Sequence, residues 1–213
     1  MLSISENVSQ EIKKIVERCS FDPWIGTPLE GYYKLSPSNM GEVGEILISD
    51  YMTMNLNSIV QDRTDPGHDR IVDGYKVEMK FSAAGRDLNK QKIKKSEFVI
   101  NHIAVSKDWD RLVFFGINPN DEDSLRLFFS KKDFIENIEY LFDSKILRKQ
   151  QSGKNGGNDD YMIPNTQAKK LFDLDWVYPI ENWHDTNASC NKNLSEGLWY
   201  WHTESGVRNL TSG

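Results

Sequence analysis

The dipeptide Asp73-Gly74, set between two runs rich in β-branched and aromatic residues, constrains the fold of this chain more than any other feature. The runs are 68–72 and 75–81. Aspartate and glycine both tolerate the positive φ angles that a two-residue hairpin turn requires. The sequence therefore predicts an antiparallel hairpin, and pairing outward from its turn places Asp69 opposite Glu78.

The second run of the hairpin alternates between apolar and polar side chains. The apolar members are Tyr75, Val77, Met79 and Phe81, and the polar members are Lys76, Glu78, Lys80 and Ser82. Because side chains of a strand alternate between its two faces, one face is expected to be apolar and the other polar. Glu78 and Lys80 therefore project to the same side, where Asp69 adds a third group.

The carboxylates of Asp69 and Glu78 are predicted to need a cation. Directly opposed residues of a hairpin have Cβ atoms about 4.5–5.5 Å apart. Two carboxylates at that spacing repel, so one stays protonated unless a cation lies between them. Oxygen ligands with open positions suit Mg²⁺, and Lys80 would orient or deprotonate a water, or neutralise charge on a phosphate. Asp73 is the alternative first ligand if the turn is longer than two residues.

Charge is distributed unevenly along the chain. The net charge is −6, yet residues 76–95 hold seven cations and two carboxylates, a local net of +5. A basic strip on an acidic body indicates a face that meets a polyanion, and a solvated lysine-rich surface is the alternative. The lysines that we expect to contact phosphates are Lys90, Lys92, Lys94 and Lys95.

Hydrophobic spacing and turn residues predict the remaining elements. Helices are expected over 4–18, over about 39–57 with a capping box from Asn39 to Glu42, and over about 131–143 with Ser130 as cap. Strands are expected over 111–118 and 125–129, whereas 98–105 is predicted as a strand or a helix turn and 86–97 as a polar loop or helix. Residues 150–160 are expected to form a flexible loop, and the tryptophan-rich tail to pack against the body. This order predicts a mixed α/β fold in a single domain.

Composition excludes several classes of protein. The chain has 213 residues, and domains average about 150, which favours one domain with elaborations. No apolar run approaches the roughly 18 residues of a membrane span, and residues 1–19 lack the apolar core of a secretion signal. Cys19 and Cys190 are too few for a disulfide scaffold. We therefore expect a cytoplasmic protein with no membrane partner.

Zinc is not expected, because His184, Cys190 and His202 include no compact pair of ligands. His68, beside Asp69, is expected to contact substrate or solvent.

The constellation Asp69…Glu78-x-Lys80 resembles the PD-(D/E)xK nuclease superfamily. The resemblance covers about residues 38–130, leaving a C-terminal elaboration over about 131–213 within one nuclease domain, 1–213. It implies the restriction-endonuclease-like fold, a central mixed β-sheet flanked by helices, in which a helix and then a strand follow the catalytic strand. The sequence departs from the literal motif in having His68, and not proline, before Asp69.

The resemblance also implies a function. The chain would be a Mg²⁺-dependent endodeoxyribonuclease acting on double-stranded DNA, most like a Type II restriction endonuclease, and a homodimer. Asp69 and Glu78 would bind the metal, Lys80 would assist catalysis, and Glu45 from the preceding helix would complete the site, with Glu42 the less suitable choice. Lys154, in the 150–160 loop, would contact DNA. A repair or recombination nuclease and a non-catalytic DNA-binding subunit are the alternatives.

Overall fold

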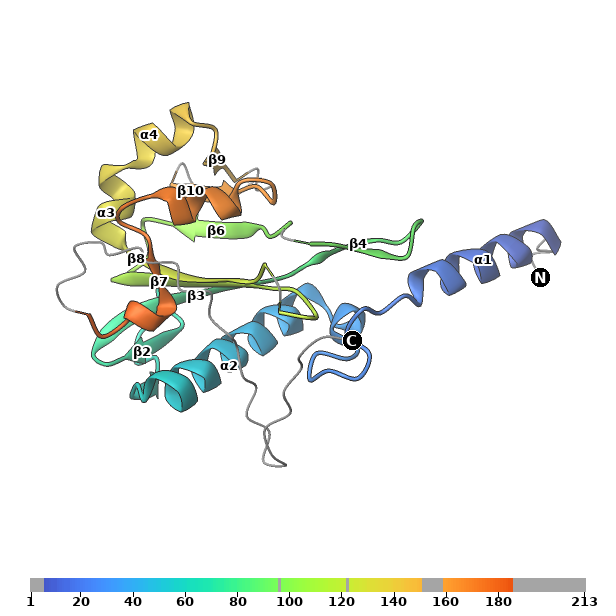
Figure 1. Ribbon diagram of the computed structural model, residues 1–213, viewed down its shortest axis with the longest axis horizontal. Helices are drawn as coiled ribbons and strands as arrows, with labels where there is room; N and C mark the ends of the chain where they lie inside the picture. The colour runs from blue at the N-terminus through green and yellow to red at the C-terminus, as the bar shows by residue number, and fades with distance from the viewer. Residues whose placement is uncertain (1–5, 96, 122, 151–158, 186–213) are drawn as a thin grey trace.

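A mixed β-sheet with helices beside it forms the centre of the protein, as the computed structural model shows for residues 6–95, 97–121, 123–150 and 159–185 (Figure 1). The helices are α1 (Glu6–Cys19), α2 (Pro37–Leu56), α3 (Lys131–Glu136) and α4 (Ile138–Asp143), with the 3₁₀ helices η1 (Tyr32–Lys34), η2 (Ala168–Asp173) and η3 (Ile180–Asn182). The strands are β1 (Val60–Asp62), β2 (Arg70–Val72), β3 (Tyr75–Ala83), β4 (Gly85–Asp87), β5 (Lys92–Lys94), β6 (Ile100–Ala104), β7 (Arg111–Ile117), β8 (Leu125–Ser130), β9 (Arg148–Lys149), β10 (Asp160–Ile163) and β11 (Tyr178–Pro179). The α/β class predicted from the sequence is confirmed.

The six-stranded sheet of the described residues has the order β1-β2-β3-β7-β8-β11, in which β3 and β7 are parallel and the other neighbours antiparallel. Its hairpin has the predicted turn, but the β2–β3 ladder ends at the pair Arg70–Val77, so the predicted pairing of Asp69 with Glu78 is not part of it. Val72 pairs with Tyr75, and Asp73 and Gly74 both have positive φ, 49° and 85°. The register therefore follows from turn chemistry that is readable in the sequence.

Each face of the sheet is covered by its own apolar layer. On one face, Ile48 and Met52 of α2 pack in a cluster with Val77 and Met79 of β3. On the other face, Leu112 and Phe114 of β7 belong to a cluster that includes residues of β6, β10, α3, α4 and η2. Figure 1 shows α2 on one side of β3 and β7, and β6, β10, α3 and α4 on the other.

The polar face of β3 is therefore not a solvent-facing surface. Glu78 pairs in register with Leu112 and Lys80 with Phe114, under the second apolar layer. Glu78 is only 1 % exposed. Apolar and polar side chains of β3 alternate between its two faces, as predicted. The apolar layer that covers the polar face, however, comes from elements much later in the sequence, such as β10 and η2.

The connection from β3 to β7 differs from what we expected. Residues 86–97, predicted as a loop or helix, include most of the two-stranded hairpin β4–β5, and 98–105 contains the strand β6. Parallel neighbours such as β3 and β7 need a long crossover, which is commonly a helix. Here the described part of that crossover contains only strands and irregular segments, and this is a departure from the helix that the family resemblance implies.

The helices begin and end somewhat differently from their predicted bounds. α2 starts at Pro37, two residues before the predicted capping box, because the Ser36 side chain accepts a hydrogen bond from the Asn39 N–H. Ser130 caps α3 as predicted, but the expected single helix over 131–143 is divided at Asn137 into α3 and α4. Of the tail, Trp183 is buried and Trp176 packs against the core, which confirms the prediction for these two.

Candidate active site

The candidate site lies just before β2 in the sequence, where the β2–β3 ladder stops and β3 continues beyond it. The last pair of the hairpin ladder joins Arg70 to Val77. Beyond it the Asp69 side chain continues the pairing, since its Oδ2 accepts a hydrogen bond of 2.7 Å from the Met79 N–H. The Asp69 N–H in turn donates to the Val77 carbonyl at 2.9 Å. Asp69 is thus fixed beside β3 by the backbone itself.

Glu78 lies at the centre of the site and is held by two lysines. The Lys80 Nζ donates to its Oε1 at 2.7 Å and the Lys107 Nζ donates to the same oxygen at 2.9 Å. The other carboxylate oxygen, Oε2, is buried and has no hydrogen-bond partner among the described residues. A buried anion is stable only when it is paired, and here one of its two oxygens is left for a further ligand.

Lys107 is a site residue that the sequence analysis missed. It lies in the loop between β6 and β7, 29 positions after Glu78. The loop is fastened by the buried Trp109, whose Nε1 donates to the Ala104 carbonyl, and by the Lys131 Nζ, which donates to the Lys107 carbonyl. No local pattern identifies Lys107, because only the β3–β7 crossover brings it to the site.

Glu45 of α2 reaches the same edge of the sheet. Its Oε2 lies 3.3 Å from the Arg70 guanidinium, and Arg70 also donates to the Asp69 carbonyl at 2.8 Å. Glu42, one turn earlier on α2, is exposed. The structure therefore brings Glu45, and not Glu42, towards Asp69.

Electrostatic repulsion connects the three carboxylates. Burial raises the pKa of Asp69, and the charge of Glu78 raises it further. Burial likewise raises the pKa of Glu45, with a second contribution from Asp69. Lys107 shows the complementary effect: burial opposes its charge, but the hydrogen bond and charge of Glu78 outweigh burial, and its pKa is raised. The raised pKa values of Asp69 and Glu45 favour the binding of a cation beside them.

Asp73, the alternative first ligand, is occupied with a structural role. Its Oδ1 accepts a hydrogen bond from the Ile59 N–H and its Oδ2 one from the Trp183 Nε1, both at 2.8 Å. Burial opposes the charge of Asp73, but these hydrogen bonds outweigh burial, and its pKa is lowered. Asp69 is therefore the better candidate for a ligand.

His68 does not face solvent, contrary to one of the two roles expected for it. Its side chain is buried, with 1 % exposure, and both ring nitrogens lack a hydrogen-bond partner among the described residues. The preceding Gly67 has φ 123° and passes so close to Asp108 that a Cβ there would lie 2.9 Å from the Asp108 nitrogen. The chain thus packs tightly as it enters the site.

The donor set fits a hard divalent cation. Mg²⁺ is commonly bound by one or two carboxylates and keeps several waters, so Asp69 and the Glu78 Oε2 are the candidate protein ligands. In the described part of the chain, no three histidine, cysteine, aspartate or glutamate side chains are grouped so that they could hold a metal ion.

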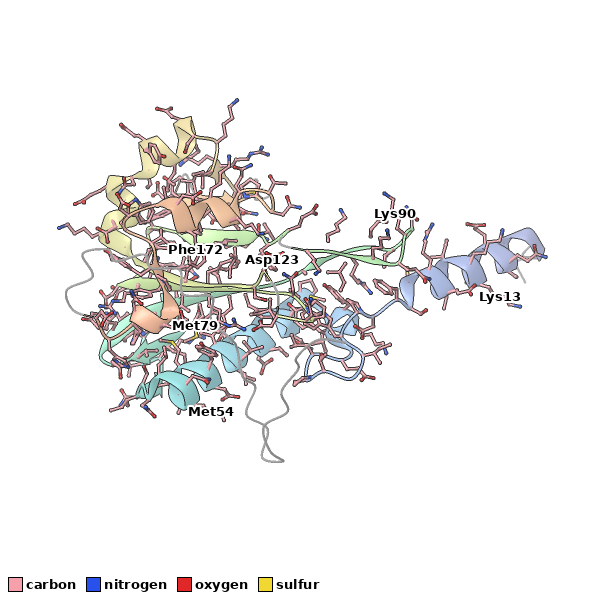
Figure 2. The ribbon with its side chains drawn as sticks, viewed as in Figure 1. Lys13, Met54, Met79, Lys90, Asp123 and Phe172 are labelled. Carbon is pink, nitrogen blue, oxygen red and sulfur yellow. The ribbon has the colours of Figure 1, made fainter. Side chains whose placement is uncertain are left out.

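The predicted DNA-contacting lysines lie away from this cluster. Lys90, Lys92, Lys94 and Lys95 are exposed residues of the β4–β5 hairpin and its flanks. This arm continues directly from β3 and extends away from the sheet, and Figure 2 labels Lys90 on it. Lys90 pairs with Asp87 at 3.8 Å and Lys94 with Glu97 at 3.6 Å. Lys154 lies outside the described residues, as does most of the 150–160 loop.

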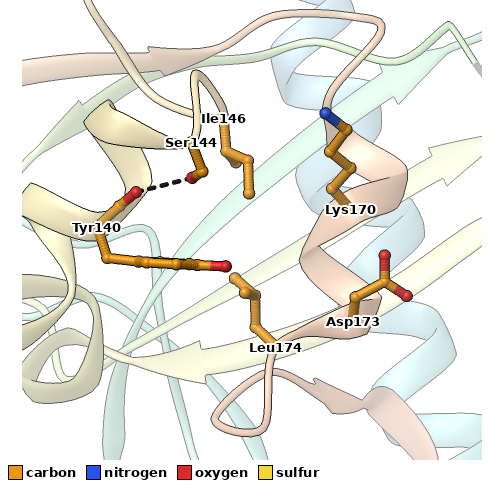
Figure 3. A pocket seen from close by; sticks show the side chains of 6 residues that line it. All are labelled: Tyr140, Ser144, Ile146, Lys170, Asp173 and Leu174. Carbon is orange, nitrogen blue, oxygen red and sulfur yellow. Dashed lines mark hydrogen bonds between the residues drawn. The ribbon is translucent and has the colours of Figure 1, made fainter.

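A shallow pocket of about 260 Å³ opens elsewhere, between α4 and η2 (Figure 3). It is lined by Tyr140, Ser144, Ile146, Lys170, Asp173 and Leu174. None of the predicted site residues lines it. With one lysine and one aspartate it offers no group comparable to the carboxylate cluster.

Comparison with known proteins finds no family model that matches this chain and no curated protein that is significantly similar to it. Within the described residues, no helix has the length and apolar character needed to cross a membrane.

Proposed function

We propose that the protein is a Mg²⁺-dependent endodeoxyribonuclease of the PD-(D/E)xK type, with a restriction-endonuclease-like core and Type II, site-specific activity. The observation that supports this proposal best is the convergence of Asp69, Glu78 and Lys80 at the open edge of β3, with a buried Glu78 oxygen that lacks a partner among the described residues. A module that only binds DNA has no need of opposed carboxylates, whose repulsion raises the cost of folding.

The residues divide the chemistry between them. Asp69 and Glu78 would hold the cation, which supplies a Lewis acid for phosphate oxygens and an activated water when bound. Lys80, held by Glu78 as an ammonium group, would orient the attacking water. Lys107 would neutralise negative charge that develops on the phosphate, because its side chain is 43 % exposed while its ammonium group reaches Glu78. Glu45 would support the water shell.

The exposed lysine arm would position the DNA. Phosphate contacts give register without sequence choice, so the arm residues Lys90, Lys92, Lys94 and Lys95 suit the backbone of any duplex. Base recognition is assigned to loops, with Lys154 and its neighbours as candidates. A two-fold homodimer would cut both strands of a palindromic site.

A digest of phage DNA with Mg²⁺ tests the proposal. Discrete fragments are expected from the wild-type chain and none from Glu78→Gln. Glu45→Gln and Glu42→Gln form a matched pair on one helix: the first should slow cleavage and the second should not. A smear or cleavage of branched DNA alone would indicate a repair or recombination nuclease, and DNA binding without cleavage would indicate a non-catalytic subunit.

A further inference from the structure

The apolar side of α1 is uncovered in the described part of the chain. Val8, Ile12, Ile15 and Val16 are between 41 % and 63 % exposed, and every residue from 8 to 20 is exposed. Figure 1 shows α1 projecting from the body, beyond the β4–β5 arm, and Figure 2 labels Lys13 on it. A helix of 14 residues is close to the minimum of about 12–15 for stability in water, so packing of its apolar side should decide whether it persists.

The spacing on α1 is that of a coiled-coil seam. Val8, Ile12, Ile15 and Cys19 are separated by four, three and four residues, so they take successive d, a, d and a positions of a heptad. The outward positions b, c and f hold only polar residues, namely Gln10, Lys13, Lys14 and Glu17. One side of the helix is thus suited to packing against another helix, and the opposite side is suited to water.

We propose that α1 pairs in antiparallel orientation with α1 of a second copy of this chain. In an antiparallel pair each a residue packs against a d residue of the partner, so Ile12 meets Ile15 and Val8 meets Cys19. This register places the g positions opposite each other, and they are Glu11 and Arg18. Two ion pairs of opposite charge form by symmetry.

Parallel pairing lacks this complementarity. There a g position faces the following e position of the partner, which sets Glu11 against the apolar Val16 and leaves the carboxylate without a cation across the seam. Within one chain, Glu11 pairs only loosely with Lys14, at 3.7 Å on the surface, and the Arg18 Nη1 donates to the Asn89 Oδ1 at 3.3 Å. Both are exposed contacts that a second copy can replace.

The proposal is independent of whether the β3 site cleaves DNA. Its first test is disulfide trapping in a chain that also carries Cys190→Ser. With Val8→Cys added, mild oxidation should link the thiol introduced at position 8 of one chain to Cys19 of the other and give a covalent dimer on a non-reducing gel. Within one helix these two positions are about 16 Å apart, too far for a disulfide, so a link must join two chains.

The same chain without Val8→Cys is the control for orientation. It should remain unlinked, because the antiparallel register separates the two Cys19 residues. A Cys19–Cys19 dimer would instead mean parallel pairing and would overturn the proposal. Monomeric mass by light scattering over a concentration series, with no trapping by Val8→Cys, would also overturn it, since the apolar side would then be covered within the chain.

Charge exchange provides a second, independent measurement. Glu11→Arg and Arg18→Glu should each weaken dimerisation by about tenfold, because each places like charges opposite one another twice. The double variant should restore wild-type dimerisation. Ile12→Asp should abolish it, whereas Ile25→Asp, at a residue that is 71 % exposed and outside α1, should not change it. Failure of the double variant to recover would contradict the proposed register.

Discussion

β3 and the β4–β5 arm that continues from it both carry lysines, but in opposite surroundings. The Lys80 side chain is 17 % exposed and its Nζ lies 2.7 Å from Glu78, whereas the Lys90 side chain is 73 % exposed and 3.8 Å from Asp87. The hydrogen bond to a buried carboxylate holds the Lys80 charge in one place. A charge in water contributes attraction without fixed geometry. Under the proposed function, this contrast separates a region suited to catalysis from a region suited to contacts with DNA phosphates.

The largest expected effect is the loss of cleavage in Glu78→Gln and Lys80→Ala. A positioned acid or base contributes about 10²–10⁴ in rate, so each variant should lose at least about 100-fold while DNA affinity stays within a few-fold. Cleavage rates with Mg²⁺ and a binding titration with Ca²⁺ give the two quantities. Lys132→Ala, 80 % exposed on α3, is the matched control. Normal turnover in either site variant would show that the site is wrongly assigned.

Because Glu78 is buried between two lysines, its variant needs a separate check of folding. Removing one partner of a buried ion pair is commonly destabilising. A thermal melt of Glu78→Gln, recorded beside the cleavage assay, distinguishes an inactive folded chain from an unfolded one.

Neutralising Lys90, Lys92, Lys94 and Lys95 together should weaken DNA binding by about tenfold or more at low salt, equally for different sequences. Each lost phosphate contact should flatten the slope of log affinity against log salt by about 0.9. Salt-titrated binding to two duplexes measures this. The control replaces four exposed lysines elsewhere, Lys132, Lys145, Lys169 and Lys170. If the arm variant keeps the wild-type slope of log affinity against log salt, the arm lysines do not contact DNA phosphates and form only a solvated surface.

Lys107→Ala should slow cleavage less than the Glu78 and Lys80 variants do, and it should also change the affinity for metal. Cleavage should fall by about tenfold, below the range of a positioned acid or base, because Lys80 remains in place. Affinity for Mn²⁺ should rise, since Lys107 competes with the cation for the Glu78 carboxylate. Calorimetric titration reads the metal affinity without reference to activity. If both quantities match the wild type, Lys107 serves only to fasten the β6–β7 loop.

The smallest effect is on stability. The pKa of Asp69 is raised by burial and by Glu78, so above that pKa its charge lowers the free energy of unfolding. Asp69→Asn keeps an acceptor for the Met79 N–H and should raise the melting temperature of the metal-free protein by about 2–4 °C near pH 7. The advantage should shrink as the pH falls through the raised pKa of Asp69, where the wild-type carboxyl becomes neutral.

With added Mg²⁺, the wild type should melt at a higher temperature than Asp69→Asn, the reverse of the order expected without metal. The wild type should be stabilised by the cation and Asp69→Asn should not, because binding to the folded state alone raises stability. Equal stabilisation of both proteins by Mg²⁺ would remove Asp69 from the set of ligands.

Much of the site can be predicted from the sequence because its geometry is local. The Asp73-Gly74 turn sets the hairpin register, and the period of two places Glu78 and Lys80 on one side. Glu45 was expected from the family resemblance and not from local geometry, and the structure shows that Glu45, unlike the exposed Glu42, lies beside Arg70. Nothing local identifies Lys107.

The sequence by itself thus determined the hairpin, the capping of α3 by Ser130 and the two buried strands β7 and β8, since each depends on residues within a few positions. Only the tertiary structure decided that the polar face of β3 is buried. It also decided that the 86–97 region forms a β-arm and that Lys107 contacts Glu78. These features depend on contacts across tens of residues, and the energy of such contacts is absent from any short stretch of sequence.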